Sequence, residues 1–175
     1  LSRRGTLADQ VVRIELPERI HRPAAAVRSR RANGEPSTSR PELEYFNGLG
    51  GFANDGREYV TVLGPGQSTP APWLNVIANP SFGFQVSESG AGYTWSGNSR
   101  ENQLTPWSND PVSDPCGEAI YVRDDETGEL WGPTALPIRC EDSTYVARHG
   151  AGYSRFEHMH DGIRLDPTKV TIDIS

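Results

Sequence analysis

The 175-residue sequence carries 23 acidic and 17 basic side chains, a formal net charge of −6 at pH 7. Its length suits one domain with a sizeable hydrophobic core and is short for two. The 18 glycines and 14 prolines favour many turns over long helices. No apolar run approaches the ~20 residues of a membrane-spanning helix, so we expect no direct membrane insertion.

Residues 1–42 are predicted to form a basic linker. Residues 1–40 hold nine arginines against four acidic side chains, a local charge of +5, whereas the remainder carries −11. Residues 7–16 favour a short helix ended by Pro17, and 28–41 (RSRRANGEPSTSRP) lack any periodicity. A basic arm can bind nucleic acid or an anionic membrane. The Pro/Ser-rich composition is more typical of a solvated linker. The rest of the chain is acidic, so we expect no basic surface there that could bind nucleic acid.

Residues 43–175 are predicted to form a β-domain, because short alternating segments follow one another between turn signals. Trp73, Asn75 and Ile77 should share one face of a strand, as should Phe82, Phe84 and Val86, since strand side chains repeat with period two. The predicted strand segments are 57–63, 73–79, 82–89, 92–97, a hairpin over 118–133, 143–150, 152–166 and 169–175. This pattern favours an all-β sandwich. The chain lacks an initiator Met and ends in a predicted strand, so we expect it to be a piece of a longer protein.

Glycine-rich segments at 48–56 and 64–68 have neither the GK[ST] ending of a phosphate loop nor a following helix. We interpret them as tight turns. Cys116 and Cys140 stand singly, without the spacing of a zinc site. Two free thiols in a reducing compartment are the default reading, with a single disulfide bridge as the open alternative.

Candidate catalytic and metal-binding groups are few. His158 and His160 would share a strand face near His149, but no further ligand is visible in the sequence, so we predict no metal site. No nucleophile motif is present. Three carboxylates at Asp110, Asp114 and Glu118 could form a glycosidase pair, or could cap turns beside prolines.

The stretch 98–111 (NSRENQLTPWSNDP) is a long polar connection with a tryptophan inside it. Trp95 precedes it and Trp131 follows at some distance. Sugar sites combine an aromatic platform with planar amide, carboxylate and guanidinium groups, and this stretch supplies all of them. The alternative is that the tryptophans belong to the core and the polar groups hold the loop in place.

The segments 44–60, 70–95, 97–134 and 145–163 resemble, in order, the N-terminal β-domain of the cellobiose/chitobiose phosphorylase family. Within that family they are most similar to the phosphorylase-like region of cyclic β-1,2-glucan synthases. The resemblance covers roughly residues 44–175. It implies an antiparallel super-sandwich of the galactose-mutarotase-like kind, which we expect to be truncated at its C-terminal side.

The resemblance further implies that catalysis lies elsewhere. In the family an (α/α)₆ barrel follows the sandwich, and its Asp protonates the glycosidic oxygen while inorganic phosphate attacks as co-substrate. We therefore expect no catalytic residue, metal or cofactor in this chain. Its implied partners are a β-glucan oligosaccharide, the barrel of the parent chain and a second copy in a homodimer. The implied location is the cytoplasmic side of the bacterial inner membrane, in a membrane-anchored parent.

By position, the stretch 98–111 matches a loop that reaches toward the active-site mouth in the family. The resemblance assigns a substrate-side or interdomain role to six residues: Arg100, Glu101, Asn102, Trp107, Asn109 and Asp110. Arg100 could instead bind an anion such as phosphate, because its planar guanidinium is always charged. Two other readings stay open, an independent carbohydrate-binding module and a free-standing glycosidase that uses the acidic cluster.

Overall fold

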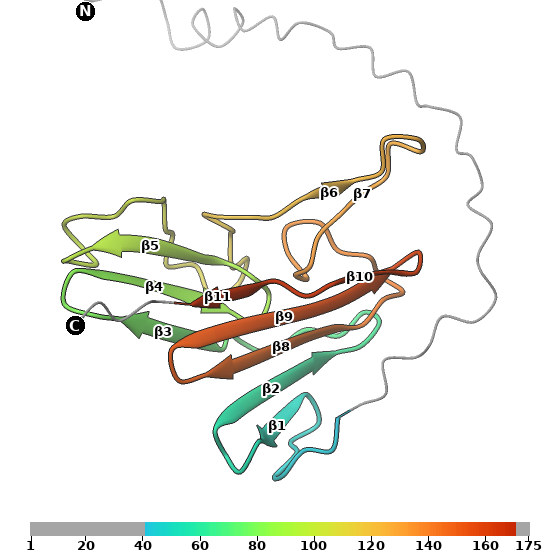
Figure 1. The fold of residues 1–175 in the computed structure, drawn as a ribbon, viewed down its shortest axis with the longest axis horizontal. Helices are drawn as coiled ribbons and strands as arrows, with labels where there is room; N and C mark the ends of the chain where they lie inside the picture. Colours follow the sequence, from blue (N-terminus) through green and yellow to red (C-terminus); the bar gives the residue numbers. More distant parts are fainter. Residues whose placement is uncertain (1–40, 171–175) are drawn as a thin grey trace, which may run out of the picture. The chain divides into compact units, whose positions relative to one another are not determined.

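The computed structural model describes residues 41–170, and within this range every regular element is a β-strand (Figure 1). The predicted helix at 7–16 and nearly all of the basic linker lie outside the described residues, as does the end of the last predicted strand. The strands are β1 Gly50–Ala53, β2 Glu58–Leu63, β3 Leu74–Ala78, β4 Phe82–Ser87, β5 Gly92–Ser96, β6 Val122–Arg123, β7 Leu130–Trp131, β8 Tyr145–Gly150, β9 Tyr153–His160, β10 Ile163–Leu165 and β11 Thr168–Val170.

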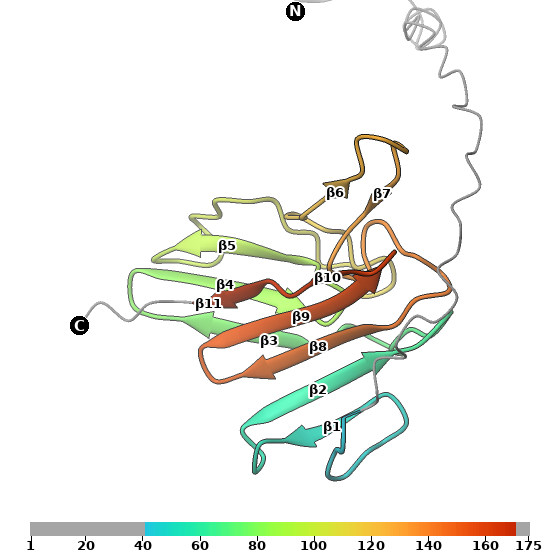
Figure 2. The ribbon, with the colours of Figure 1, turned by 45° about the vertical axis from the view of Figure 1, so that its right-hand side comes forward.

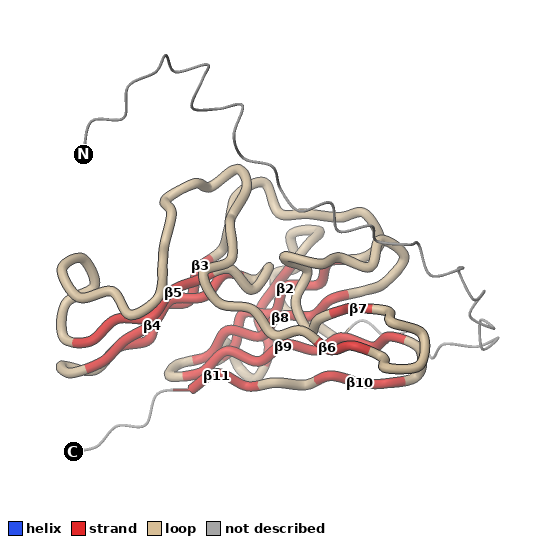
Figure 3. Tube along the Cα trace, turned by 90° about the horizontal axis from the view of Figure 1, so that it is seen from above, coloured by secondary structure: helices blue, strands red, loops and turns tan. Residues whose placement is uncertain are grey.

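All strand pairs are antiparallel, which confirms the predicted all-β antiparallel class. One sheet has the order β1-β2-β8-β9-β10, with β11 also pairing with β9, and a second has the order β3-β4-β5. Strands and loops alone make up the described trace (Figure 3). Within residues 41–170, no helix has the length and apolar character needed to cross a membrane.

The two larger sheets form the layers of a sandwich (Figure 2). Ile77, Phe84 and Val86 of the smaller sheet pack against Ala147 and Phe156 of the larger one. All five side chains are at most 6% exposed. Burying a large apolar side chain is worth about 1.5–3 kcal/mol, so this cluster is a main source of stability.

The predicted alternation of β3 is confirmed by its burial. Ile77 is buried, whereas Leu74 and Val76 on the opposite face are 48% and 60% exposed. Asn75 shares the inner face and ties the two sheets together, because its Nδ2 donates to the carbonyl oxygen of Gly150 at 3.1 Å. The same amide also reaches the Ser154 hydroxyl at 3.0 Å.

The outer face of the larger sheet is held by ion pairs. Glu157 of β9 is 9% exposed and accepts from Arg148 Nε at 2.7 Å and from an Arg164 guanidinium nitrogen at 2.8 Å. These partners lie on β8 and β10, so one carboxylate joins three strands. Charge-assisted hydrogen bonds of this kind are roughly twice as strong as neutral ones.

Three segments differ from the sequence-based expectation. The segment 152–166, predicted as one strand, is divided by a turn at Asp161 and Gly162 into β9 and β10. The glycine-rich segment 48–56 contains strand β1, so its interpretation as tight turns alone was wrong; the turn occupies only the residues between β1 and β2. A side chain at Gly51 would meet the Glu44 carbonyl oxygen at 2.6 Å, so glycine is needed where residues 44–46 pass close by. The hairpin over 118–133 exists but its paired strands are two residues each.

Candidate functional site

The segment between β5 and β6 covers the outer face of the β3-β4-β5 sheet. Gln85 points to this face, because its neighbours Phe84 and Val86 point into the core. Gln85 pairs with Tyr93 across β4 and β5, and Gly83 pairs with Trp95, so both aromatic rings share the outer face. A side chain at Gly83 would lie 2.5 Å from the Trp95 ring, which shows how closely that ring packs on the strand.

The first part of the segment forms a turn beyond the end of β5. Asn98 Oδ1 accepts from the backbone N–H groups of Arg100 and Glu101, both at 2.9 Å. Asn102 Nδ2 donates to the Ser96 carbonyl oxygen at 3.0 Å. Asparagine side chains stabilise turns in this way, so Asn98 and Asn102 have a structural reason to be here.

Arg100 and Glu101 project from this turn into solvent. Their side chains are 90% and 75% exposed and form a loose ion pair of 3.5 Å. A pair this exposed contributes little to stability. Both side chains are therefore available to a ligand or a partner domain.

The second part of the segment returns along the sheet and places Trp107 over Tyr93. The two rings are stacked, with centroids 4.9 Å apart and planes 20° apart, and Tyr93 in turn contacts Trp95. Trp107 is 39% exposed, whereas Trp95 is 7% exposed. Trp107 is thus a solvent-exposed ring that is held in place by stacking on the buried Tyr93 ring.

A small cavity of about 120 Å³ adjoins Trp107. Its lining includes Leu74, Gln85, Asn109, Asp110 and Asp114. Gln85 is 8% exposed, and its Nε2 has no hydrogen-bond partner among the described residues. A buried amide without a partner is costly, so this donor is suited to a ligand oxygen.

Asp110 and Asp114 differ in their surroundings. Asp110 closes a turn by accepting from the Ser113 hydroxyl at 2.6 Å and from Val112 N at 2.9 Å, and these bonds lower its pKa. Burial raises the pKa of Asp114, although the Ser87 hydroxyl, 2.6 Å away, partly opposes this. Glu118 accepts from the hydroxyls of Thr94 and Thr105. Asp110 caps a turn within the loop, as the turn-capping alternative expected, whereas Asp114 and Glu118 bind the loop to β4 and β5.

The structure divides the six site residues predicted from sequence into two groups. Arg100, Glu101 and Asn102 lie at the turn beside Ser96, whereas Trp107, Asn109 and Asp110 lie at the cavity beside Tyr93. Ser96 and Tyr93 are three residues apart on β5, about 10 Å at roughly 3.3 Å per residue. A ligand of more than one sugar ring would be needed to contact both groups.

Sequence reasoning missed Gln85 and Tyr93, which complete the second group. Both lie inside predicted strands. The alternation of apolar and polar residues there does not reveal that the loop after β5 will cover the outer face of the sheet. Trp131 is not part of this surface, since it is 3% exposed on β7 with its ring against His160.

His158 and His160 are explained by their contacts within the protein. His158 stacks on Tyr145 at 4.0 Å and its Nδ1 lies 2.7 Å from the Gly132 carbonyl oxygen. Glu129, His160 and Asp161 place ligand atoms within 4.8 Å of one another, the one such group among residues 41–170. Glu129 and Asp161 are exposed, and His160 Nε2 lies 2.9 Å from Glu129 Oε1, which accounts for their proximity. Cys116 and Cys140 are free thiols.

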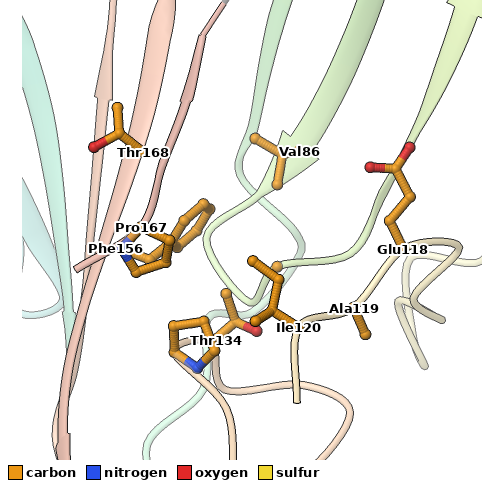
Figure 4. Close-up of a pocket in the computed structure, with 10 residues that line it drawn as sticks. Val86, Glu118, Ala119, Ile120, Thr134, Phe156, Pro167 and Thr168 are labelled. Atoms are coloured by element: carbon orange, nitrogen blue, oxygen red, sulfur yellow. The ribbon is translucent and has the colours of Figure 1, made fainter. Parts of the chain in front are cut away.

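Another cavity, of about 350 Å³, lies between the sheets (Figure 4). Phe156 and Pro167 lie at one end and Glu118 at the other, with Ile120 and Thr134 between them (Figure 4). Its walls are mainly apolar, and Glu118 is engaged by Thr94 and Thr105. We call Trp107 and the neighbouring Gln85, Asn109 and Asp110 the Trp107 surface. It combines an exposed ring with polar groups, which suits a sugar better than the mainly apolar walls of this cavity.

Comparison with known proteins agrees with the fold. Residues 57–173 match the family model described as glycosyl hydrolase 94, supersandwich domain. The chain is 41% identical over 174 residues to the cyclic beta-(1,2)-glucan synthase NdvB of Rhizobium meliloti (strain 1021), covering 94% of this chain and 6% of that protein.

Two further relatives are phosphorylases by name. The N,N'-diacetylchitobiose phosphorylase of Vibrio furnissii is 36% identical over 116 residues, 65% of this chain and 14% of that protein. The solabiose phosphorylase of Paenibacillus borealis is 35% identical over 118 residues, 66% of this chain and 15% of that protein. The chain therefore spans a small part of the length of each of these relatives. The matches confirm the resemblance seen in the sequence, and the chain belongs to the glycosyl hydrolase 94 supersandwich domain family.

Proposed function

We propose that this chain is a non-catalytic carbohydrate-recognition and interdomain β-sandwich of a larger β-glucan-processing protein. The observation that carries the proposal is the Trp107 ring, 39% exposed and stacked on Tyr93. An exposed ring on a rigid base can cover the apolar face of a pyranose at low entropic cost. Gln85, Asn109 and Asp110 beside it can meet the hydroxyls at the sugar edge.

The ligand in this proposal is a β-linked glucan oligosaccharide. Its support is the 41% identity to a protein named for cyclic beta-(1,2)-glucan synthesis. The parent would be a membrane-anchored glycosyltransferase and inverting glycoside phosphorylase at the cytoplasmic side of the bacterial inner membrane. It would use inorganic phosphate as co-substrate, and its acid would lie in an (α/α)₆ barrel.

Arg100 and Glu101 have a different role in the proposal. They are exposed on a turn held by Asn98 and make only a loose mutual ion pair. We assign them to contact with the barrel or with a second copy in a homodimer, where an arginine fork can bind a carboxylate or phosphate in two places.

The proposal is tested by titrating β-1,2-linked glucotriose into the ¹⁵N-labelled chain and following the indole signal of Trp107. We expect this signal to shift with a Kd of about 1 mM, a weak affinity of about −4 kcal/mol, because part of the site belongs to the parent. Asn109→Ala should weaken the response severalfold. Tyr121→Ala, which removes an aromatic ring 53% exposed in the segment before β6, should leave it unchanged.

Two results would contradict the proposal. One is a Trp107 signal that stays fixed up to about 20 mM glucotriose, well beyond the expected affinity. The other is glucose 1-phosphate released from β-1,2-glucan and phosphate by the pure chain, because that requires a catalytic acid within it. Micromolar binding that disappears in Trp107→Ala would instead indicate an independent carbohydrate-binding module.

A further inference from the structure

A second groove lies where β1 and β2 meet the start of β3. Its volume is about 510 Å³, within the range of roughly 300–1,000 Å³ typical of small-molecule sites. Six side chains matter for its chemistry: Phe52, Arg57, Tyr59, Trp73, Asn75 and His149. None of them belongs to the Trp107 surface.

Three aromatic rings form one wall of this groove. Phe52 and Tyr59 meet edge to face with centroids 5.2 Å apart, and Tyr59 and Trp73 do the same at 5.5 Å. Phe52 is 40% exposed, so it offers part of its ring to solvent. The edge-to-face arrangement is favourable for aromatic rings.

The aromatic wall is held in place by polar contacts. The Tyr59 hydroxyl accepts from Asn47 Nδ2 at 3.1 Å. The Trp73 backbone N–H donates to Glu88 Oε2 at 2.7 Å, and Glu88 itself is 2% exposed. A binding surface fixed before the ligand arrives loses less entropy on binding.

Polar groups complete the groove. The Asn75 amide is fixed by Gly150 and Ser154, and the Arg57 side chain is exposed. Nδ1 of His149 lies 2.9 Å from the Ser154 hydroxyl, and the Trp73 backbone also contacts the imidazole. Burial lowers the pKa of His149 to about 4, so the imidazole is neutral at pH 7. A neutral imidazole and an amide are typical partners of sugar hydroxyls.

Leu74 connects this groove with the Trp107 surface. It lines both the 510 Å³ groove and the cavity beside Trp107, and it is 48% exposed. The two surfaces therefore meet at one side chain at the start of β3. A chain of several sugar rings could pass over Leu74 from one surface to the other.

We propose that this aromatic groove, lined by Phe52, Tyr59, Trp73 and His149, is a second glucosyl-binding site for the same β-glucan chain. The inference rests on the proposed function for the class of ligand. It does not rest on Trp107, because the groove has rings and polar groups of its own. The ligand is a neutral β-linked glucan segment, with a pyranose face against Phe52 and hydroxyls toward His149 and the Asn75 amide oxygen. The Asn75 amide nitrogen is already engaged by Gly150, Tyr153 and Ser154.

The test follows the indole signals of Trp73 and Trp107 while β-1,2-linked glucotriose is added to the ¹⁵N-labelled chain. Trp131 is the internal control, since it is buried on β7 and lines neither surface. We expect both Trp73 and Trp107 to shift. Phe52→Ala should weaken the binding reported by Trp73 about tenfold and leave the Trp107 response in place. Trp107→Ala, which lacks the Trp107 indole, should leave the Trp73 response in place. Arg57→Ala is a second variant, which changes the groove at an exposed side chain. Circular dichroism verifies that each variant is folded.

The outcomes separate the two proposals. A Trp73 response that is lost in Phe52→Ala and kept in Trp107→Ala supports the groove. A shift of Trp107 with Trp73 unmoved overturns the groove and leaves the proposed function standing. A Trp73 response that is as strong in Phe52→Ala and Arg57→Ala as in the wild type also overturns it. If neither signal moves, both proposals fail.

Discussion

Trp95 and Trp107 lie on the same sheet face but have opposite roles. Trp95 packs on Gly83 and is 7% exposed, so it supports the sheet. Trp107 is stacked on the Trp95 neighbour Tyr93 and keeps 39% of its surface in solvent. The sequence predicts a tryptophan-rich surface, but residue type alone cannot tell a buried ring from an open one.

His149 gives a prediction at the residue scale. Its pKa is lowered from 6.5 to about 4, chiefly because burial disfavours the imidazolium, and a backbone contact from Trp73 offsets only part of this. The folded-state pKa lies below the unfolded one. The stabilising contribution is therefore complete above pH 6.5 and is lost as the pH falls toward 4.

Between pH 7.5 and pH 5 we expect the wild type to lose about 2 kcal/mol more unfolding free energy than His149→Gln, since each pH unit below 6.5 costs about 1.4 kcal/mol. Urea denaturation of both proteins at the two pH values measures this difference. His158, whose pKa is also lowered by burial, is present in both proteins and cancels. Equal losses in the two proteins would show that His149 is not the titrating group.

At the scale of elements, the β4-β5 hairpin and the loop that follows it form the candidate site together. Ser87 on β4 donates to Asp114 at 2.6 Å, and Leu104 N donates to the Thr94 carbonyl oxygen at 2.8 Å, so the loop is bound at several points. The loop thereby covers the free edge of β5, which would otherwise expose unpaired backbone groups.

Gly83→Ala tests the packing of this hairpin. The added methyl group would lie 2.5 Å from the Trp95 ring, so we expect the unfolding free energy to fall by about 1–3 kcal/mol. Urea denaturation monitored by tryptophan fluorescence measures it. Val76→Ala, an exposed position on β3, is the matched control and should change stability by about 0.5 kcal/mol or less. A Gly83→Ala variant as stable as the control would mean that Trp95 is free to move.

The elements also show where sequence-based prediction succeeds and fails. Strands β2 to β5, β8 and β9 all lie within predicted strand segments, because each contributes buried apolar side chains that mark it in the sequence. β1 was missed because Gly50 and Gly51 carry no side chain to show a period. The hairpin at 118–133 was predicted too long, since Ile120 and Tyr121 alternate with their neighbours but are 57% and 53% exposed and lie outside the strands.

For the whole molecule, the sequence predicts the sandwich class but not which strands share a sheet. The pairing of β2 with β8 joins residues more than 80 positions apart, and no local pattern specifies such a partner. The same holds for the site. Trp107, Asn109 and Asp110 were named from the sequence, but Gln85 joins them only because the loop folds back over β4. Their proposed role in sugar binding stays a prediction.

A crystal structure of this chain soaked with β-1,2-linked glucotriose tests the central claim most directly. We expect a glucosyl ring stacked on Trp107 at van der Waals distance, roughly 3.5–4 Å, with a hydroxyl oxygen within hydrogen-bonding distance of Gln85 Nε2. A sugar bound away from Trp107, or no sugar while Trp107 is open to solvent in the crystal, would contradict the account.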